Sequence, residues 1–83
     1  MQLEISTPSE NIPSQEVDFV TLPAHAGETQ VLPGHTQLIT NLLAGNLQFQ
    51  SKGQSHQYSI SGGIADISQE KVLVLCEGLT ELK

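Results

Sequence analysis

The chain contains 83 residues, of which 37% are hydrophobic and 14% are charged, and its formal net charge at pH 7 is −6. This length allows one small domain with a thin core and excludes a two-domain enzyme. Three lysines without any arginine cannot form the basic surface that nucleic acid or anionic lipid headgroups require. The longest apolar run, residues 72–76, is far shorter than the about 20 residues that span a bilayer, and no secretion signal follows Met1.

Alternation of apolar and polar residues predicts short β-strands along most of the chain. The predicted strands lie at residues 2–6, 16–22, 31–34 (a short strand that runs into a turn at Pro33 and Gly34), 47–50, 58–60, 64–67 and 72–76. The predicted connections, rich in Pro, Gly or polar residues, lie at 9–14, 24–28, 51–54, 61–63 and 68–70. Pro23 is expected to end the second strand, and the apolar run at 72–76 is expected to be buried on both faces. About seven or more closely spaced strands predict an all-β sandwich or flattened barrel in a single domain.

Residues 38–43 allow two interpretations. Their apolar residues recur at a spacing that indicates an amphipathic helix, and Gly45 suits a helix C-cap. Two helical turns are short for an isolated helix, however, because helix nucleation is unfavourable. The pattern by itself therefore leaves both a helix and a strand open at this position.

No group of residues in the sequence indicates catalysis or cofactor binding. The three histidines lack a second ligand at the spacing typical of zinc sites, and Cys76 lies alone in an apolar run, as a buried and unreactive thiol would. The glycines form neither a nucleophile elbow nor a phosphate-binding loop. Glu16 and Asp18 are interpreted as solvated acids. We therefore predict no catalytic residue, no cofactor and no metal, and a surface that docks to other proteins.

Several blocks of sequence carry a resemblance to a known family. The segment Gly-Glu-Thr-Gln-Val-Leu-Pro-Gly-His at residues 27–35, followed by Leu-Ile-Thr-Asn-Leu at 38–42, resembles the N-terminal domain of the epsilon subunit of F-type ATP synthases. The segments Gly-Asn-Leu-Gln-Phe at 45–49, Ile-Ser-Gly-Gly-Ile at 60–64 and Val-Leu-Val-Leu-Cys at 72–76 are similar to the same family in order and separation.

The resemblance implies a flattened, ten-stranded β-sandwich over residues 1–83. Members of the family commonly continue into a C-terminal helical hairpin, and the expectation for this chain, which departs from them here, is no C-terminal helical domain. It also implies that residues 38–43 are extended, so that one face enters the core while Ile39 and Leu43 lie on the outer surface. Gln30 stands where the family usually has glycine, and a glycine-like conformation there would be strained.

The same resemblance implies a noncatalytic central-stalk, or rotor, subunit of a membrane-bound F-type ATP synthase. Such a subunit links the gamma subunit to the membrane rotor ring and couples ion translocation to ATP synthesis. Its expected location is peripheral to the membrane, on the cytoplasmic face of a bacterial plasma membrane or the stromal or matrix-side equivalent. The residues expected at the rotor-ring interface are Gly27, Glu28, Thr29, Leu32 and His35, and those expected at the gamma subunit are Ile39 and Leu43. The alternative is a free-standing β-sandwich adaptor that binds other proteins.

Overall fold

Ten β-strands make up most of the computed structural model, which describes residues 1–34 and 37–82. The strands are β1 (Gln2–Ser6), β2 (Asn11–Glu16), β3 (Phe19–Ala24), β4 (Gly27–Val31), β5 (Leu38–Leu42), β6 (Gly45–Ser51), β7 (Gln54–Ile60), β8 (Gly63–Ile67), β9 (Lys71–Cys76) and β10 (Leu79–Leu82). Hydrogen-bonded neighbours follow the order β10-β7-β6-β3-β5-β8-β9-β1-β2, and β4 pairs with β3. Among these pairs, β1 runs parallel to β9. The predicted all-β, ten-stranded fold is confirmed.

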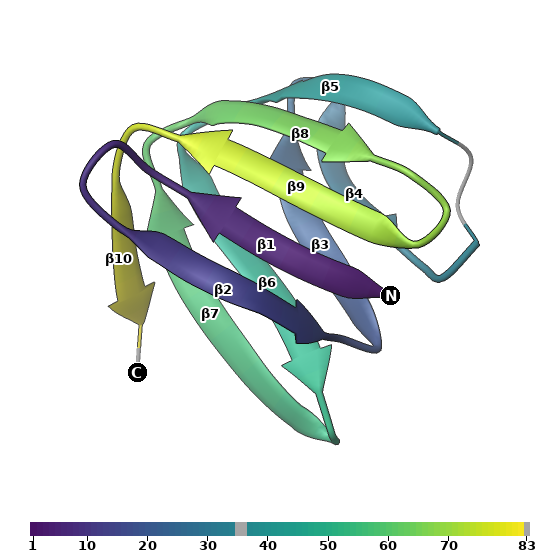
Figure 1. Cartoon of the computed structure of the whole chain (residues 1–83). Helices are drawn as coiled ribbons and strands as arrows, with labels where there is room; N and C mark the ends of the chain where they lie inside the picture. Colours follow the sequence, from purple (N-terminus) through teal and green to yellow (C-terminus); the bar gives the residue numbers. More distant parts are fainter. Residues whose placement is uncertain (35–36, 83) are drawn as a thin grey trace.

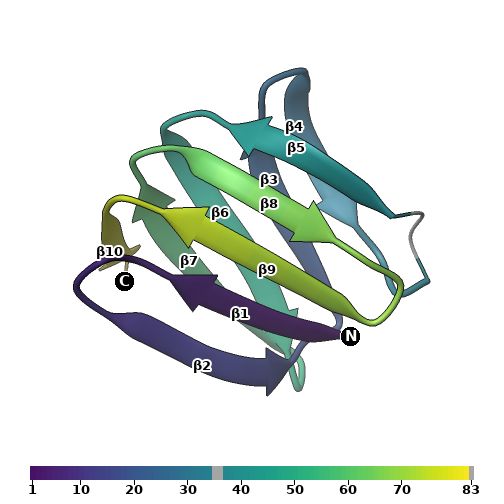
Figure 2. The same ribbon diagram turned by 45° about the horizontal axis from the view of Figure 1, so that its top comes forward.

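The sheet folds over on itself into two layers (Figure 1). Strands β5, β8, β9, β1 and β2 form the layer nearer the viewer, which we call the front layer, and β4, β3, β6, β7 and β10 form the rear layer. Figure 2 shows the front-layer strands running side by side across the rear ones. The layers join where Ala24 of β3 pairs with Leu42 of β5 and where the Leu43 N–H donates to the Pro23 carbonyl at 2.7 Å.

Side chains that point between the layers form one apolar core. Its buried members are Leu3, Ile5, Val17, Val20, Leu22, Ala24, Val31, Leu42, Leu47, Phe49, Ile60, Ala65, Ile67, Val72, Val74 and Cys76. Because side chains alternate between the two faces of a strand, the intervening residues point away from this core. The expectation that residues 72–76 are buried on both faces is wrong, since Leu75 is 47% exposed. A two-layer fold covers only one face of each strand, and β9 is no exception.

Strand β2 occupies residues that were predicted to form a polar connection. The pairing of β1 with β2 shifts register between Leu3 and Ile5, and Pro13 lies within this irregular stretch. A proline, which lacks an N–H donor, is tolerated at such a bulge on an edge strand. Most side chains of β2 are exposed, so the alternation that reveals a half-buried strand is weak there.

Several strand boundaries and one strand also differ from the prediction. The strand predicted at 16–22 begins only at Phe19, and β4 ends at Val31, where a short strand was predicted to begin. Pro23 lies inside β3 and does not end it, because pairing with β4 keeps the chain extended through Ala24. The loop predicted at 24–28 is shorter, because β4 begins at Gly27. Strand β10 was not predicted: its four residues are too few to show a period, and pairing with β7 keeps them extended.

The segment with two interpretations is a strand. Residues Leu38–Leu42 form β5, as the family resemblance implied, and the helical spacing of its apolar residues is misleading. Each residue of β5 pairs with one of β8, from Leu38 opposite Ile67 to Leu42 opposite Gly63. Hydrogen bonds between these strands replace those that a helix would form within itself, so the tertiary context overrides the local pattern.

Candidate functional site

The outward side of the front layer carries apolar side chains that the core does not cover. Ile39 on β5 is 67% exposed, Ile64 on β8 is 44% exposed, and Leu75 on β9 is 47% exposed. Ile64 lies directly opposite Leu75, and half-buried Leu73 points to the same side of β9. We call the surface formed by Ile39, Ile64, Leu73 and Leu75 the outer apolar face. Neighbouring exposed apolar side chains of this kind mark a contact surface.

A groove continues the outer apolar face at one end of the front layer. It lies between the loop after β1, at Thr7 and Pro8, and the pair formed by Ile64 and Leu75, and its volume is about 440 Å³. Cys76 also lines the groove, and Glu77 is the charged residue of its lining. Because Ile64 and Leu75 belong to both, the groove and the apolar face form one continuous surface, which offers apolar side chains and one carboxylate to a partner.

The two residues predicted to contact the gamma subunit are exposed, as expected. Ile39 lies within the outer apolar face, whereas Leu43, which is 50% exposed, follows β5 at the corner where the two layers join. Ile64 and Leu75 were not among the predicted residues. The exposure of Ile64 could have been predicted from its alternation with buried Ala65. The exposure of Leu75 was missed because residues 72–76 were expected to be buried on both faces.

Among the described residues, the predicted rotor-ring residues do not form one cluster. Gly27, Glu28 and Thr29 begin β4, and Leu32, which is 52% exposed, follows its last residue. Glu28 and Leu32 are four residues apart along this extended stretch, which at about 3.3 Å per residue places them about 13 Å apart. Glu28 is exposed, and the Thr29 hydroxyl donates to the Gly27 carbonyl at 3.3 Å. His35 lies outside the described residues.

Strand β4 is an edge strand of regular geometry. It pairs with β3, from Gly27 opposite Ala24 to Val31 opposite Val20, and its other edge carries no further strand among the described residues. Gln30 shows no glycine-like conformation, because Lys52 is the one non-glycine residue with a positive φ in the described ranges. The strain considered for Gln30 is therefore absent.

Cys76, beside the groove, is 7% exposed, and burial raises the pKa of its thiol. We expect a disulfide reagent at pH 8 to react about 100-fold more slowly with the folded protein than with the unfolded chain, because the attacking thiolate is scarce and shielded. The unfolded chain ionises first, so stability should fall as the pH rises from the ordinary thiol pKa towards the raised one. The reaction rate is measured from the coloured thiol that the reagent releases. The pH dependence of stability is compared with that of Cys76→Ala, which has no thiol to ionise. Equal rates in both states would contradict this expectation.

The described residues hold no group of three or more His, Cys, Asp or Glu side chains that could bind a metal ion. No helix within the same residues has the length and apolarity to cross a membrane.

The fold and the surface define a small β-sandwich domain with one exposed apolar face. Residues 1–81 match the family described as the ATP synthase delta/epsilon chain β-sandwich domain, and the chain belongs to this family. The resemblance stated from the sequence is confirmed.

Known relatives agree with this assignment. The chain is 40% identical over 77 residues to the ATP synthase epsilon chain of Nitratidesulfovibrio vulgaris strain DP4, which covers 93% of this chain and 58% of the relative. It superposes with a TM-score of 0.88 and 30% identity on a chain of the Euglena gracilis mitochondrial ATP synthase OSCP/F1/c-ring structure, covering 95% of this chain and 51% of that one. A chain of the Tetrahymena thermophila mitochondrial ATP synthase central stalk and c-ring shares the fold, with a TM-score of 0.81 and 13% identity. This chain thus spans between half and two thirds of the length of these relatives.

Proposed function

We propose that this chain acts as the β-sandwich part of an epsilon-type, noncatalytic central-stalk subunit of a membrane-bound F-type ATP synthase. In this role it joins the gamma subunit to the membrane rotor ring, so that ion translocation turns both together and drives ATP synthesis. Membership of the delta/epsilon family gives the proposal its context. The observation that carries it is the outer apolar face, which a protein without a partner would leave exposed to water.

The outer apolar face is proposed to contact the gamma subunit. Ile39, Ile64 and Leu75 offer side chains that are between 44% and 67% exposed, and the groove beside Leu75 extends the same surface. Burial of such apolar area stabilises an interface by about 25 cal/mol per Å² before the costs of association are subtracted. Leu43, at the corner of the two layers, lies at the margin of this contact.

The rotor ring is proposed to lie along β4 and the turn that follows it. Glu28 offers an exposed carboxylate that can accept hydrogen bonds from polar loops, and Gly27 and Thr29 flank it. Because Leu32 lies at the far end of β4, a contact that includes it must run along the free edge of this strand. His35 follows within the same stretch of sequence. Through these contacts the subunit would be held peripherally at the membrane, on the side where the catalytic head lies.

Transmission of torque requires a stiff body between the two contacts. The sandwich suits this role because its core consists of interlocked apolar side chains, and closely packed interiors deform little under load. Continuous hydrogen bonding from β10 to β2 adds resistance to shear between strands.

Ile39→Asp is expected to weaken binding to the gamma subunit from the same organism at least about tenfold, because a carboxylate would replace an exposed apolar contact within the proposed interface. Binding is measured by co-purification and calorimetry, and circular dichroism should show an unchanged fold, since Ile39 points outward. Leu82→Asp, on β10 in the rear layer, is the matched control and should bind normally.

Two outcomes would overturn the proposal. If the unaltered chain does not bind the gamma subunit, the adaptor alternative takes its place. If Ile39→Asp and Leu82→Asp bind as well as the unaltered chain, the outer apolar face is not the gamma contact.

A further inference from the structure

A row of four side chains crosses the outer side of the front layer. Strand pairing places Glu4 of β1 opposite Leu73 of β9, and Leu73 opposite Asp66 of β8. Asp66 is in turn opposite Ile39 of β5. An exposed carboxylate therefore lies between two apolar side chains of the outer apolar face, and a partner that covers both Ile39 and Leu73 must also cover Asp66.

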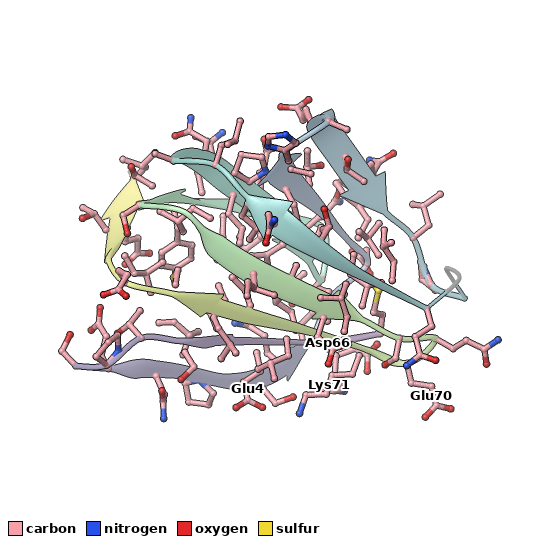
Figure 3. The ribbon with its side chains drawn as sticks, turned by 90° about the horizontal axis from the view of Figure 1, so that it is seen from above. Glu4, Asp66, Glu70 and Lys71 are labelled. Carbon is pink, nitrogen blue, oxygen red and sulfur yellow. The ribbon has the colours of Figure 1, made fainter. Side chains whose placement is uncertain are left out.

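The cation beside this row, Lys71, is paired with Glu4. The Lys71 ammonium lies 3.0 Å from a carboxylate oxygen of Glu4. Figure 3 shows these two side chains pointing towards one another from β9 and β1, with Asp66 beside them and Glu70 in the turn before β9. The other ion pair in the described ranges joins the α-ammonium of Met1 to Glu16, so Asp66 has no cationic partner among these residues.

Covering Asp66 without a compensating charge would oppose binding. A carboxylate that loses its water and gains no partner is strongly disfavoured, and such a penalty would offset the burial of neighbouring apolar groups. A cation from the partner would reverse this effect, because charge-assisted hydrogen bonds in a water-poor interface are among the stronger polar contacts. The charge pattern therefore restricts which surface can cover this face.

We infer that the outer apolar face binds a surface of the gamma subunit that places an arginine or lysine against Asp66 and an apolar side chain in the groove beside Ile64 and Leu75. Ile64 is two residues from Asp66 along β8, so the apolar group and the cation should lie about 7 Å apart. Arginine suits the position best because its planar guanidinium can bind a carboxylate through two hydrogen bonds. This inference rests on the proposed function, because it takes the gamma subunit as the partner.

The test compares charge variants in binding to the isolated gamma subunit from the same organism. Asp66→Asn is expected to weaken binding about tenfold and to make the affinity less dependent on salt, and Asp66→Lys to weaken it about 100-fold by placing like charges together. Glu81→Gln, which removes an exposed acid from β10 in the rear layer, is the matched control and should bind normally. Thermal unfolding of each variant checks that the fold is intact.

The outcomes separate this inference from the proposed function. If Ile39→Asp weakens binding while Asp66→Asn and Asp66→Lys remain within twofold of the unaltered chain, the gamma contact stands and the charge pairing is wrong. If the unaltered chain does not bind the gamma subunit, both fail. Recovery of binding when an acidic substitution in the gamma subunit is combined with Asp66→Lys would identify the paired residue directly.

Discussion

Gly63→Ala is expected to lower the free energy of unfolding by about 3 kcal/mol or more, because the added methyl group has no room. A Cβ built at Gly63 would lie 2.0 Å from the carbonyl oxygen of Leu75 and 2.9 Å from the Cα of Cys76. Both are backbone atoms of β9, so the two strands would have to separate. The φ of +152° at Gly63 is also one that residues with side chains rarely adopt. Urea unfolding followed by circular dichroism measures the change.

Gly27→Ala is the control that separates the clash of an added methyl group from the strain of a positive φ. Gly27 has a φ of +124°, but nothing lies within 4 Å of a Cβ built there. Its substitution should cost only the conformational strain, about 1–2 kcal/mol. If Gly63→Ala and Gly27→Ala destabilise the protein equally, the close approach of β8 to β9 is not what requires glycine at position 63.

Phe49→Ala is expected to lower the free energy of unfolding by about 3–5 kcal/mol, the range for loss of a buried aromatic side chain. Phe49 is 1% exposed and lies between the layers on β6. Its ring stacks on His56 with centroids 5.0 Å apart and on Tyr58 at 6.0 Å. The substitution therefore removes a large part of a thin core, and such a small domain should be partly unfolded at 37 °C.

Phe19→Ala is the matched control for this experiment. Phe19 is half-buried on β3 and alternates with buried Val20, so it points to the outer side of the rear layer. The same truncation there should cost about 1 kcal/mol. Denaturant midpoints for both variants make the comparison, and similar losses would mean that the core does not lie where the strand alternation places it.

The local sequence pattern predicted the structure correctly where a strand buries one face and where a turn requires residues with positive φ. Leu47 and Phe49 alternate with glutamines on β6, and both point into the core as predicted. The predicted hairpin connection at 51–54 is also present, with positive φ values of 53° at Lys52 and 78° at Gly53. Period-two alternation and a glycine in such a turn arise from neighbouring residues, so the sequence reveals them.

Local pattern failed where pairing with another strand or packing between the layers decides the outcome. Residues 38–43 have a helical spacing but are held extended by β8, and polar β2 is a strand because β1 pairs with it. Leu75 was predicted to be buried, and the number of layers in the fold determines its exposure. In each case the deciding hydrogen bonds or contacts come from another strand or the other layer, and the pattern of the segment itself does not reveal them.

The amino-acid sequence by itself determined the β class and most of the strands, because these follow from alternation. Its ordered motifs also determined the family and, through the family resemblance, the exposure of Ile39 and Leu43. Only the tertiary structure decided that Asp66 lies between Leu73 and Ile39, and that β4 separates Gly27 from Leu32. Strand order and register place these side chains, and both are set by pairing across the whole sheet.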